Sequence, residues 1–190
     1  PEPRARYRVE LGIASAGRFG LLASGDRGAH FPGPGLRYYV LLCDGMGTGK
    51  AAAVGGVLAA SLTKELLHAG FESASTARLV TLALALKSAD ESAVALDALS
   101  IDLYTGDAVL YKAGAAASFL LRDGKAAVYS GDTLPIGILG SVTGRRELLW
   151  LRAPPGCARS SWLTRTTRPR SWRMRWPARR GKSSRTCPTT

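Results

Sequence analysis

The residues best suited to chemistry lie in one glycine-rich segment, Cys43 to Lys50, which reads Cys-Asp-Gly-Met-Gly-Thr-Gly-Lys. It follows a continuous apolar run that predicts a buried strand, and it precedes apolar residues at helical spacing. Ligands of α/β proteins commonly bind where a buried strand passes into a helix. Asp44 stands at that junction, and the small residues after it would let a hydrated ion and a phosphoryl group approach the backbone. The segment is therefore a candidate site for metal-assisted phosphate chemistry.

Two other phosphate-binding patterns fail on this segment. A P-loop needs glycine at position 44 and Ser or Thr after the lysine, where the chain has Asp44 and Ala51. The dinucleotide fingerprint, read from Gly45, needs a glycine where the chain has Lys50. Two interpretations stay open on spacing alone. Asp44 either binds a hard divalent cation such as Mg²⁺ or Mn²⁺, or it is a turn aspartate before a tight glycine turn.

A second candidate acid, Asp26, lies in the segment Ser24-Gly25-Asp26, before the strand that delivers Asp44. The residues around it are rich in glycine and proline and predict a loop, because Pro32 and Pro34 disfavour a helix there. If the strands adjoin, the carboxylates of Asp26 and Asp44 converge, and Asp44 can bridge two ions.

The rest of the chain must position these acids, and its apolar periodicity predicts the elements that do so. Strands are expected at residues 7–14 and 36–43, and helices from Ala51 to Ala69 and from about Thr76 to Lys87, with Gly70 as the C-terminal cap of the first. From residue 98 the period changes to that of strands joined by short turns, an antiparallel meander. The strands expected there cover residues 99–104, 108–112, 118–122, 126–129 and 147–151. Strands, two helices and further strands predict an α+β layered domain.

The charge of the chain is concentrated at its end. The 190 residues include 26 Lys and Arg and 14 Asp and Glu, a net charge of +12. Residues 1–151 hold all 14 acids and 15 basic residues, whereas residues 152–190 hold 11 basic residues and no acid. We therefore predict a folded domain at residues 1–151 and a basic, disordered tail at residues 152–190, without strand or helix periodicity. The charge describes this tail and does not predict a specific nucleic-acid partner.

The cysteines and the apolar segments bear on the environment of the chain. Cys43, Cys157 and Cys187 are an odd number at wide spacing, which fits neither a disulfide framework nor a zinc ligand set. A reducing, cytosolic environment is expected. The longest apolar stretch, residues 51–62, is too short to span a bilayer, and no secretory signal opens the chain. We expect this piece to be soluble by itself, and its start at Pro1 is compatible with a cut from a larger, membrane-anchored protein.

The segment from Asp44 to Gly49, followed by Ala51 and Ala52, is similar to the Asp-Gly-Met-Gly-x-Gly signature of the stage II sporulation protein E phosphatases. That family is a PP2C-like branch of the metal-dependent protein phosphatases. Further matches follow in the family's order and cover about residues 8–151. They are Asp90-Glu91, Leu96-Asp97, residues 99–103, residues 112–115, Ser118-Phe119, Arg122 and residues 134–138. The resemblance therefore rests on an ordered series and not on a lone motif.

The resemblance implies a fold and a reaction. The fold is a layered αββα sandwich of two antiparallel sheets flanked by helices, with a two-metal centre of Mn²⁺ or Mg²⁺ at one edge. The reaction is attack of a metal-activated water on the phosphorus of phosphoserine or phosphothreonine. Asp44 would be the catalytic residue that bridges the metals, and Asp26 and the Gly45 carbonyl would be the other metal ligands present.

The resemblance also implies a partner and a location. The family's usual substrate is a phosphorylated anti-anti-sigma factor protein, whose dephosphorylation frees a sporulation sigma factor. Action at the cytoplasmic face, within a membrane-anchored full-length protein, follows from the same likeness. Homodimerisation through the helices of residues 51–87 stays open.

The sequence departs from the family after residue 151. The family has a further metal aspartate soon after this position, in a second Ser/Thr-Asp-Gly segment, whereas this chain has no acid after Glu147. Because the closing strands and helix are missing from the pattern, we expect the C-terminal part of the sandwich to be incomplete. We hypothesise that residues 152–190 are translated out of frame, since shifted codons for Ser161 to Thr164 can encode Leu-Ala-Asp.

Two other functions remain open beside an active phosphatase. One is a catalytically inactive remnant of the same fold, and the other is polyanion binding through the basic tail. The remaining acids of the strand region are expected to have structural roles in strands and turns. They are Asp97, Asp102, Asp107 and Asp123.

Overall fold

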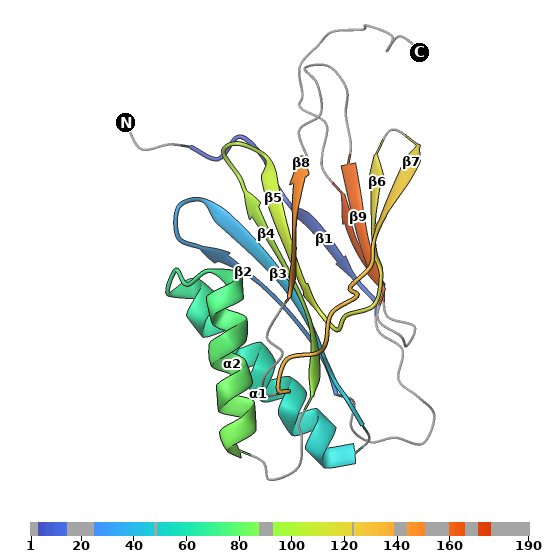
Figure 1. Cartoon of the computed structure of the whole chain (residues 1–190). Helices are drawn as coiled ribbons and strands as arrows, with labels where there is room; N and C mark the ends of the chain where they lie inside the picture. The colour runs from blue at the N-terminus through green and yellow to red at the C-terminus, as the bar shows by residue number, and fades with distance from the viewer. Residues whose placement is uncertain are drawn as a thin grey trace, which may run out of the picture.

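Two antiparallel sheets face each other, and helices cover the outer face of one of them (Figure 1). The computed structural model describes residues 4–14, 25–47, 49–87, 93–122, 124–138, 144–150, 160–165 and 171–175. The predicted α+β class, with two antiparallel sheets and flanking helices, is confirmed. In the described part of the chain, both helices lie on the same sheet, which we call the helix-covered sheet.

The helix-covered sheet has the strand order β2-β3-β4-β5-β8. Its strands are β2 (Asp26–Gly33), β3 (Arg37–Gly45), β4 (Val94–Asp102), β5 (Asp107–Ala113) and β8 (Arg145–Trp150). The sequence predicted all of these except β2, whose residues were expected to form a loop. That expectation is wrong, and the reason is the position of β2 at the edge of the sheet. An edge strand tolerates proline because one row of its N–H groups has no partner strand, so Pro32 can pair with Tyr38.

The second sheet has the strand order β1-β10-β9-β6-β7. Its strands are β1 (Glu10–Ile13), β6 (Ser118–Arg122), β7 (Lys125–Tyr129), β9 (Ser160–Arg165) and β10 (Ser171–Arg175). The expected meander is therefore divided, since β4 and β5 belong to the helix-covered sheet and β6 and β7 to the second sheet.

Strands β9 and β10 lie within residues 152–190, where no strand periodicity was found. These two segments pair with each other and join β1 to β6. Both strands are short, and apolar residues alternate with polar ones only in β10, whereas Trp162 and Leu163 are adjacent in β9, so the segment gives little strand periodicity. The disordered tail expected for residues 152–190 and the missing closing elements of the sandwich stay predictions. The division of the chain at residue 151 stays a prediction.

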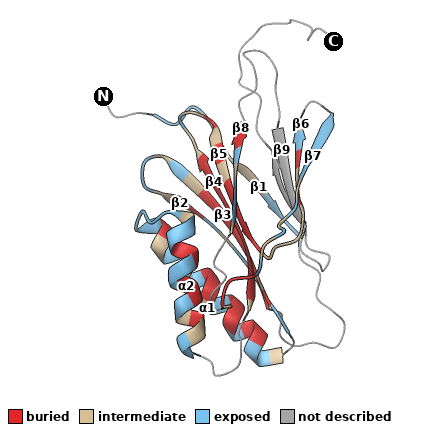
Figure 2. Ribbon diagram, viewed as in Figure 1, coloured by how far each residue is buried: buried red, intermediate tan, exposed pale blue. Residues whose placement is uncertain are grey.

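The two helices are α1 (Gly49–His68) and α2 (Ser73–Lys87). Helix α1 ends as predicted at Gly70, which has a φ of 91° and, with Phe71, donates backbone hydrogen bonds to the last turn. Helix α1 packs on β2 and β3, and α2 packs on α1. The leucines on the outer side of α2 are exposed, up to 89% for Leu86 (Figure 2). No helix among the described residues is both long and apolar enough to cross a bilayer.

Alternation along β3 sends its side chains into two separate cores. Leu41 and Cys43 pack with the helices, in a cluster that includes Ala59 and Val80. Val40 packs in the other core, between the two sheets, in a cluster that includes Leu99 of β4 and Leu120 of β6. Because successive side chains of a strand point to opposite faces, Asp44 belongs to the face that looks toward the second sheet.

Candidate metal centre

Asp26 and Asp44 stand directly opposite each other on neighbouring strands. In the antiparallel register of β2 and β3, Asp26 is the partner of Asp44. Directly opposed residues project from the same face of a sheet with Cβ atoms about 4.5–5.5 Å apart. Asp26 is buried and Asp44 is half-buried. The strands therefore adjoin, and the two acids meet at one end of the helix-covered sheet, as the sequence argument required.

Glycines let the backbones beside these acids pack closely together. The N–H of Gly45 donates a hydrogen bond of 3.2 Å to the carbonyl oxygen of Gly25. A Cβ atom added to Gly25 would lie 2.5 Å from the Gly45 carbonyl oxygen, which is closer than such atoms approach. Glycine at position 25 therefore allows its backbone to pack closely beside the carbonyl that was predicted to be a metal ligand.

Helix α1 is set against the same backbone by direct backbone contact. A Cβ atom on Gly45 would lie 2.1 Å from the carbonyl oxygen of Ala52, and one on Gly56 would lie 2.0 Å from the carbonyl oxygen of Gly25. The turn that leads from β3 into α1 also needs glycine, because Gly47 and Gly49 have φ values of 95° and 80°. The glycine-rich segment thus fixes the helix on the strands that carry the two acids.

A small pocket opens beside Asp44, between the end of β3 and the connection from β5 to β6. Its volume is about 70 Å³. The residues that line it are Leu42, Asp44, Met46, Ala95, Asp97, Gly114, Ala115 and Ala116. Half of these residues are alanine or glycine, and the pocket is small enough to suit a phosphoryl group.

A cluster of buried polar side chains, Asp97, Lys112 and Ser118, lies beside this pocket. The Lys112 ammonium lies 2.6 Å from the Asp97 carboxylate and donates hydrogen bonds to the carbonyl oxygen of Ala116 and the hydroxyl of Ser118. The Ser118 hydroxyl donates to the other Asp97 oxygen, at 3.2 Å. Burial raises the pKa of the Asp97 carboxyl, and the Lys112 ammonium and Ser118 hydroxyl oppose that rise.

Asp97 was expected to have a structural role, and its ion pair with Lys112 agrees with that expectation. No role was predicted for Lys112. The available signal was the resemblance itself, because Asp97, Lys112 and Ser118 all fall within segments that match the family. Their mutual contact could not be found from spacing, since they lie on three different strands.

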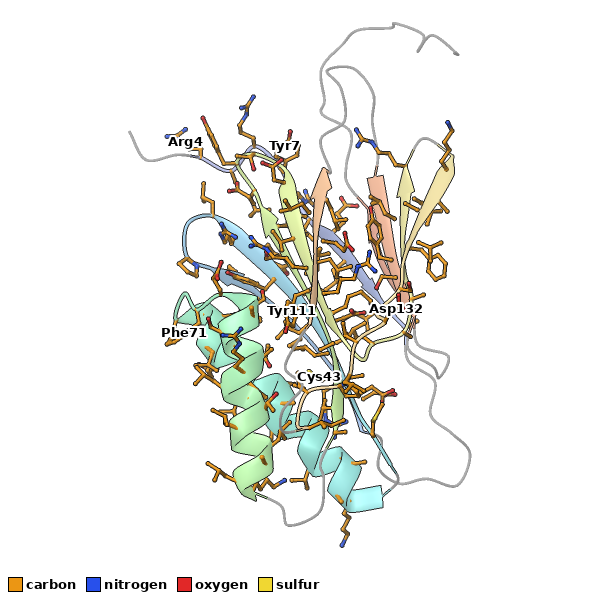
Figure 3. The ribbon with its side chains drawn as sticks, in the orientation of Figure 1. Arg4, Tyr7, Cys43, Phe71, Tyr111 and Asp132 are labelled. Carbon is orange, nitrogen blue, oxygen red and sulfur yellow. The ribbon has the colours of Figure 1, made fainter. Side chains whose placement is uncertain are left out.

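Cys43 precedes Asp44 on β3 but faces the helices and is not suited to chemistry (Figure 3). Its side chain is 1% exposed. Burial, with smaller contributions from the negative charges of Asp97 and Asp44, raises the pKa of the thiol to about 12. The thiol stays protonated at neutral pH and is therefore a packing residue.

The other acids and histidines behave as structural residues where the structure describes them. Asp102 accepts hydrogen bonds from the N–H groups of Tyr104 and Thr105, at 2.8 and 2.9 Å, and so closes the turn after β4. The His30 ring lies 2.7 Å from the Tyr38 hydroxyl. Asp123 and the pair Asp90-Glu91 lie outside the described residues.

The donor set fits part of the coordination shell of a hard cation. Like charges directly opposite each other destabilise a sheet, and a cation between Asp26 and Asp44 would remove that cost. Carboxylate and carbonyl oxygens are the ligands that Mg²⁺ and Mn²⁺ prefer, and Mg²⁺ commonly keeps several waters beside one or two carboxylates. Among the described residues there is no group of three or more acids, histidines or cysteines that could hold a metal. The chain thus offers two carboxylates and a backbone carbonyl.

Comparison with known proteins gives a family and several relatives. The sequence matches the family described as Stage II sporulation protein E (SpoIIE) over residues 34–153. It is 30% identical over 133 residues to Stage II sporulation protein E of Priestia megaterium, an alignment that covers 70% of this chain and 23% of that protein. The chain therefore spans less than a quarter of the length of this relative.

Solved structures share the fold. One contains the PP2C phosphatase domain and a fragment of the regulatory domain of the cell fate determinant SpoIIE from Bacillus subtilis. It is similar with a TM-score of 0.73 and 26% identity, over 86% of this chain and 47% of that chain. A structure of RsbX in complex with magnesium is similar with a TM-score of 0.72 and 11% identity, over 91% and 96% of the two chains. At that identity the likeness to RsbX concerns the fold alone.

Proposed function

Because this chain belongs to the stage II sporulation protein E family, we propose that it is a metal-dependent protein serine/threonine phosphatase. The observation that carries the proposal is the register pairing of Asp26 with Asp44 beside a pocket of phosphoryl size. The same end of the sandwich holds the glycines that let the backbones of Gly25 and Gly45 approach closely. The chain spans only part of its relatives, so the proposal concerns the chemistry of this domain.

Asp26, Asp44 and the Gly45 carbonyl would hold Mn²⁺ or Mg²⁺, with Asp44 as the bridging and catalytic residue. A bound divalent ion supplies an activated water and neutralises charge that develops on the phosphoryl oxygens. The chain itself positions the two carboxylates and the phosphoryl group. The contact of Gly56 with the Gly25 carbonyl fixes β2 and β3 against α1, which keeps the two carboxylates opposed. The pocket beside Asp44 limits how a phosphoryl group can approach that carboxylate.

The proposed substrate is a phosphorylated anti-anti-sigma factor protein. The support is the family membership, since relatives carry the name of a sporulation protein and a cell fate determinant. The reaction would take place at the cytoplasmic face, where such a regulator would be met. A small pocket that ends in Ala115 and Ala116 suits a phosphoseryl or phosphothreonyl side chain on an exposed loop of that partner.

One observation favours a second candidate function, a phosphatase fold that binds a phosphoprotein without hydrolysing it. The sequence has no Asp or Glu after Glu147, so residues 152–190 supply no further carboxylate for a metal. If residues 152–190 are read out of frame, the native reading would restore that acid, and the present chain would be an inactive copy.

Hydrolysis of p-nitrophenyl phosphate in the presence of Mn²⁺ separates these candidates. We expect hydrolysis by the parent chain that falls at least 100-fold in Asp44→Asn, on the order expected for loss of a metal-bridging carboxylate. The matched control is Asp132→Asn, because Asp132 is an exposed acid with only a 3.8 Å ion pair to Arg145. A parent chain that is silent, beside an active version with residues 152–190 in the alternative frame, would refute activity in this chain and favour the binding function.

A further inference from the structure

Lys112 is a fully buried lysine whose charge is completely satisfied inside the protein. Its side chain is 0% exposed, and its ammonium has three partners at 2.6, 2.7 and 2.8 Å. These partners are Asp97 of β4, the carbonyl oxygen of Ala116 and Ser118 of β6. An ammonium has three N–H donors, so every donor is used. One side chain thus joins the helix-covered sheet to the second sheet.

The bond to Ala116 matters because of where that residue lies. Gly114, Ala115 and Ala116 follow β5 and form one wall of the pocket that also contains Asp44. We call these three residues the 114–116 wall. The Lys112 ammonium donates a hydrogen bond to the carbonyl oxygen of Ala116 in this wall. The position of the wall therefore depends directly on the ammonium.

Residues 131–135 make further close contacts with the 114–116 wall. The N–H of Gly114 donates a hydrogen bond of 3.2 Å to the Thr133 hydroxyl, which donates in turn to the carbonyl oxygen of Lys112. Gly114 has a φ of 62°, and a Cβ atom there would lie 2.6 Å from Pro135. A Cβ atom on Gly131 would lie 2.9 Å from the Ala115 carbonyl oxygen. A wall with so many specific contacts is pre-organised, as binding sites require.

Stability alone is a weak reason to bury such a pair. Removing two charges from water has a large cost, and apolar residues of similar volume often stabilise a protein as well or better. What an apolar side chain cannot supply is a donor aimed at the Ala116 carbonyl. The geometry of the cluster therefore points to a role in orienting the wall.

We propose that Lys112 is a positioning residue for the phosphatase reaction. It fixes the 114–116 wall so that a phosphoseryl group in the pocket meets Asp44 in one orientation. This inference rests on the proposed function, since it specifies how the same pocket presents its substrate. Asp97 serves as the counter-ion that allows the lysine to be buried, and Ser118 serves as an accessory acceptor.

The test compares variants that do and do not release the wall. Lys112→Met with Asp97→Asn removes both charges together, so no unpaired charge is left buried, and it removes the bond to Ala116. Ser118→Ala disturbs the same cluster but leaves that bond in place. Leu110→Ala is a control for lowered stability, because Leu110 lies in the core between the sheets and does not line the pocket.

Three measurements are made on each full-length variant. They are the thermal midpoint, the amide hydrogen exchange of residues 114–118, and kcat and KM for p-nitrophenyl phosphate with Mn²⁺. In the double variant we expect exchange of this segment to rise at least tenfold and kcat/KM to fall on the order of 10- to 100-fold, as misplacement of a reacting group by about 1 Å would cause. Ser118→Ala and Leu110→Ala should keep kcat/KM within about threefold of the parent.

The outcomes separate positioning from a structural role. Unchanged kcat/KM in a folded double variant overturns the proposal, whether or not the exchange changes. If the double variant does not fold, Thr133→Val is measured in its place, because it removes the hydroxyl that accepts from the Gly114 N–H and donates to the Lys112 carbonyl. Unchanged kcat/KM in Thr133→Val overturns the proposal equally. If the parent chain hydrolyses nothing, the proposed function fails. The affinity for inorganic phosphate with Mg²⁺, measured by calorimetry, then replaces kcat/KM, and an equal affinity in parent and double variant overturns the role of Lys112.

Discussion

Gly55 and Gly56 are neighbours on α1, but an added methyl group would meet different surroundings at each. At Gly55 the nearest atom to a new Cβ is Val94 Cγ2 at 3.7 Å, an ordinary contact. At Gly56 it is the carbonyl oxygen of Gly25 at 2.0 Å, about 1 Å closer than such atoms come. Because this oxygen belongs to the backbone, it cannot rotate away, and the helix and β2 must separate.

The difference can be converted to stability. Alanine in place of glycine inside a helix stabilises it by about 1 kcal/mol, and both variants gain this amount. Overpacking of a close contact costs about 1–3 kcal/mol, and only Gly56→Ala has this cost. Gly56→Ala should therefore unfold about 2–12 °C below Gly55→Ala, at about 2–4 °C per kcal/mol for a chain of this length.

The same displacement should weaken the candidate metal site. Gly25 accepts the hydrogen bond from the Gly45 N–H and precedes Asp26, so pushing Gly25 outward separates Asp26 from Asp44. Thermal unfolding followed by circular dichroism gives the stabilities, and electron paramagnetic resonance of free Mn²⁺ gives the affinities. Equal midpoints and equal Mn²⁺ affinities in the two variants would refute the close approach of α1 to the strands.

Three further predictions concern other parts of the fold. Asp102→Ala should lower the free energy of unfolding by about 1 kcal/mol, because two turn N–H groups lose their acceptor. Urea unfolding measures this loss, with Asp132→Ala as the control at an exposed site. Burial raises the pKa of Tyr111, so its stabilising contribution is present below the usual value near 10 and is lost as pH rises further. The free energy of unfolding, measured between pH 9 and 11, should therefore fall less steeply with pH in Tyr111→Phe than in the parent. Position 164 pairs with Ser118, two residues after Ala116 of the pocket that contains Asp44. If a carboxylate on β9 completes the metal site, Thr164→Asp should raise Mn²⁺ affinity several-fold, and unchanged Mn²⁺ resonance signals would contradict this.

Much of the fold could be predicted because its periodicity is local. The apolar run before Asp44 and the helical spacing after Ala51 identified β3 and α1, and Gly70 marked the end of the helix. Strand β2 was missed because its glycines and Pro32 carry the composition of a loop. Its strand character depends on pairing with β3, which is not a local property of the sequence.

The candidate site was predictable only in part, for a related reason. Asp44 follows a recognisable strand, so its place at the end of β3 could be predicted. Its approach to Asp26 could be predicted only on the condition that the strands adjoin, because it depends on the register of a strand that was not predicted. The Lys112 cluster was harder still to predict, because sequence spacing does not show that the lysine side chain reaches Asp97, Ala116 and Ser118 at once.

Strand β9 lies in residues 152–190, where the sequence departs from its family. Its register puts position 164 opposite Ser118 and position 163 opposite Phe119, at the end of β6 that adjoins the Lys112 cluster. Shifted codons for residues 161–164 would place an aspartate at about this point. The backbone of β9 therefore passes beside the end of β6 at the position where the family resemblance predicts a further metal ligand. Strand pairing is made by backbone N–H and C=O groups, which nearly every residue type carries, so a frame change can leave the pairing in place while it removes the carboxylate on which metal chemistry depends.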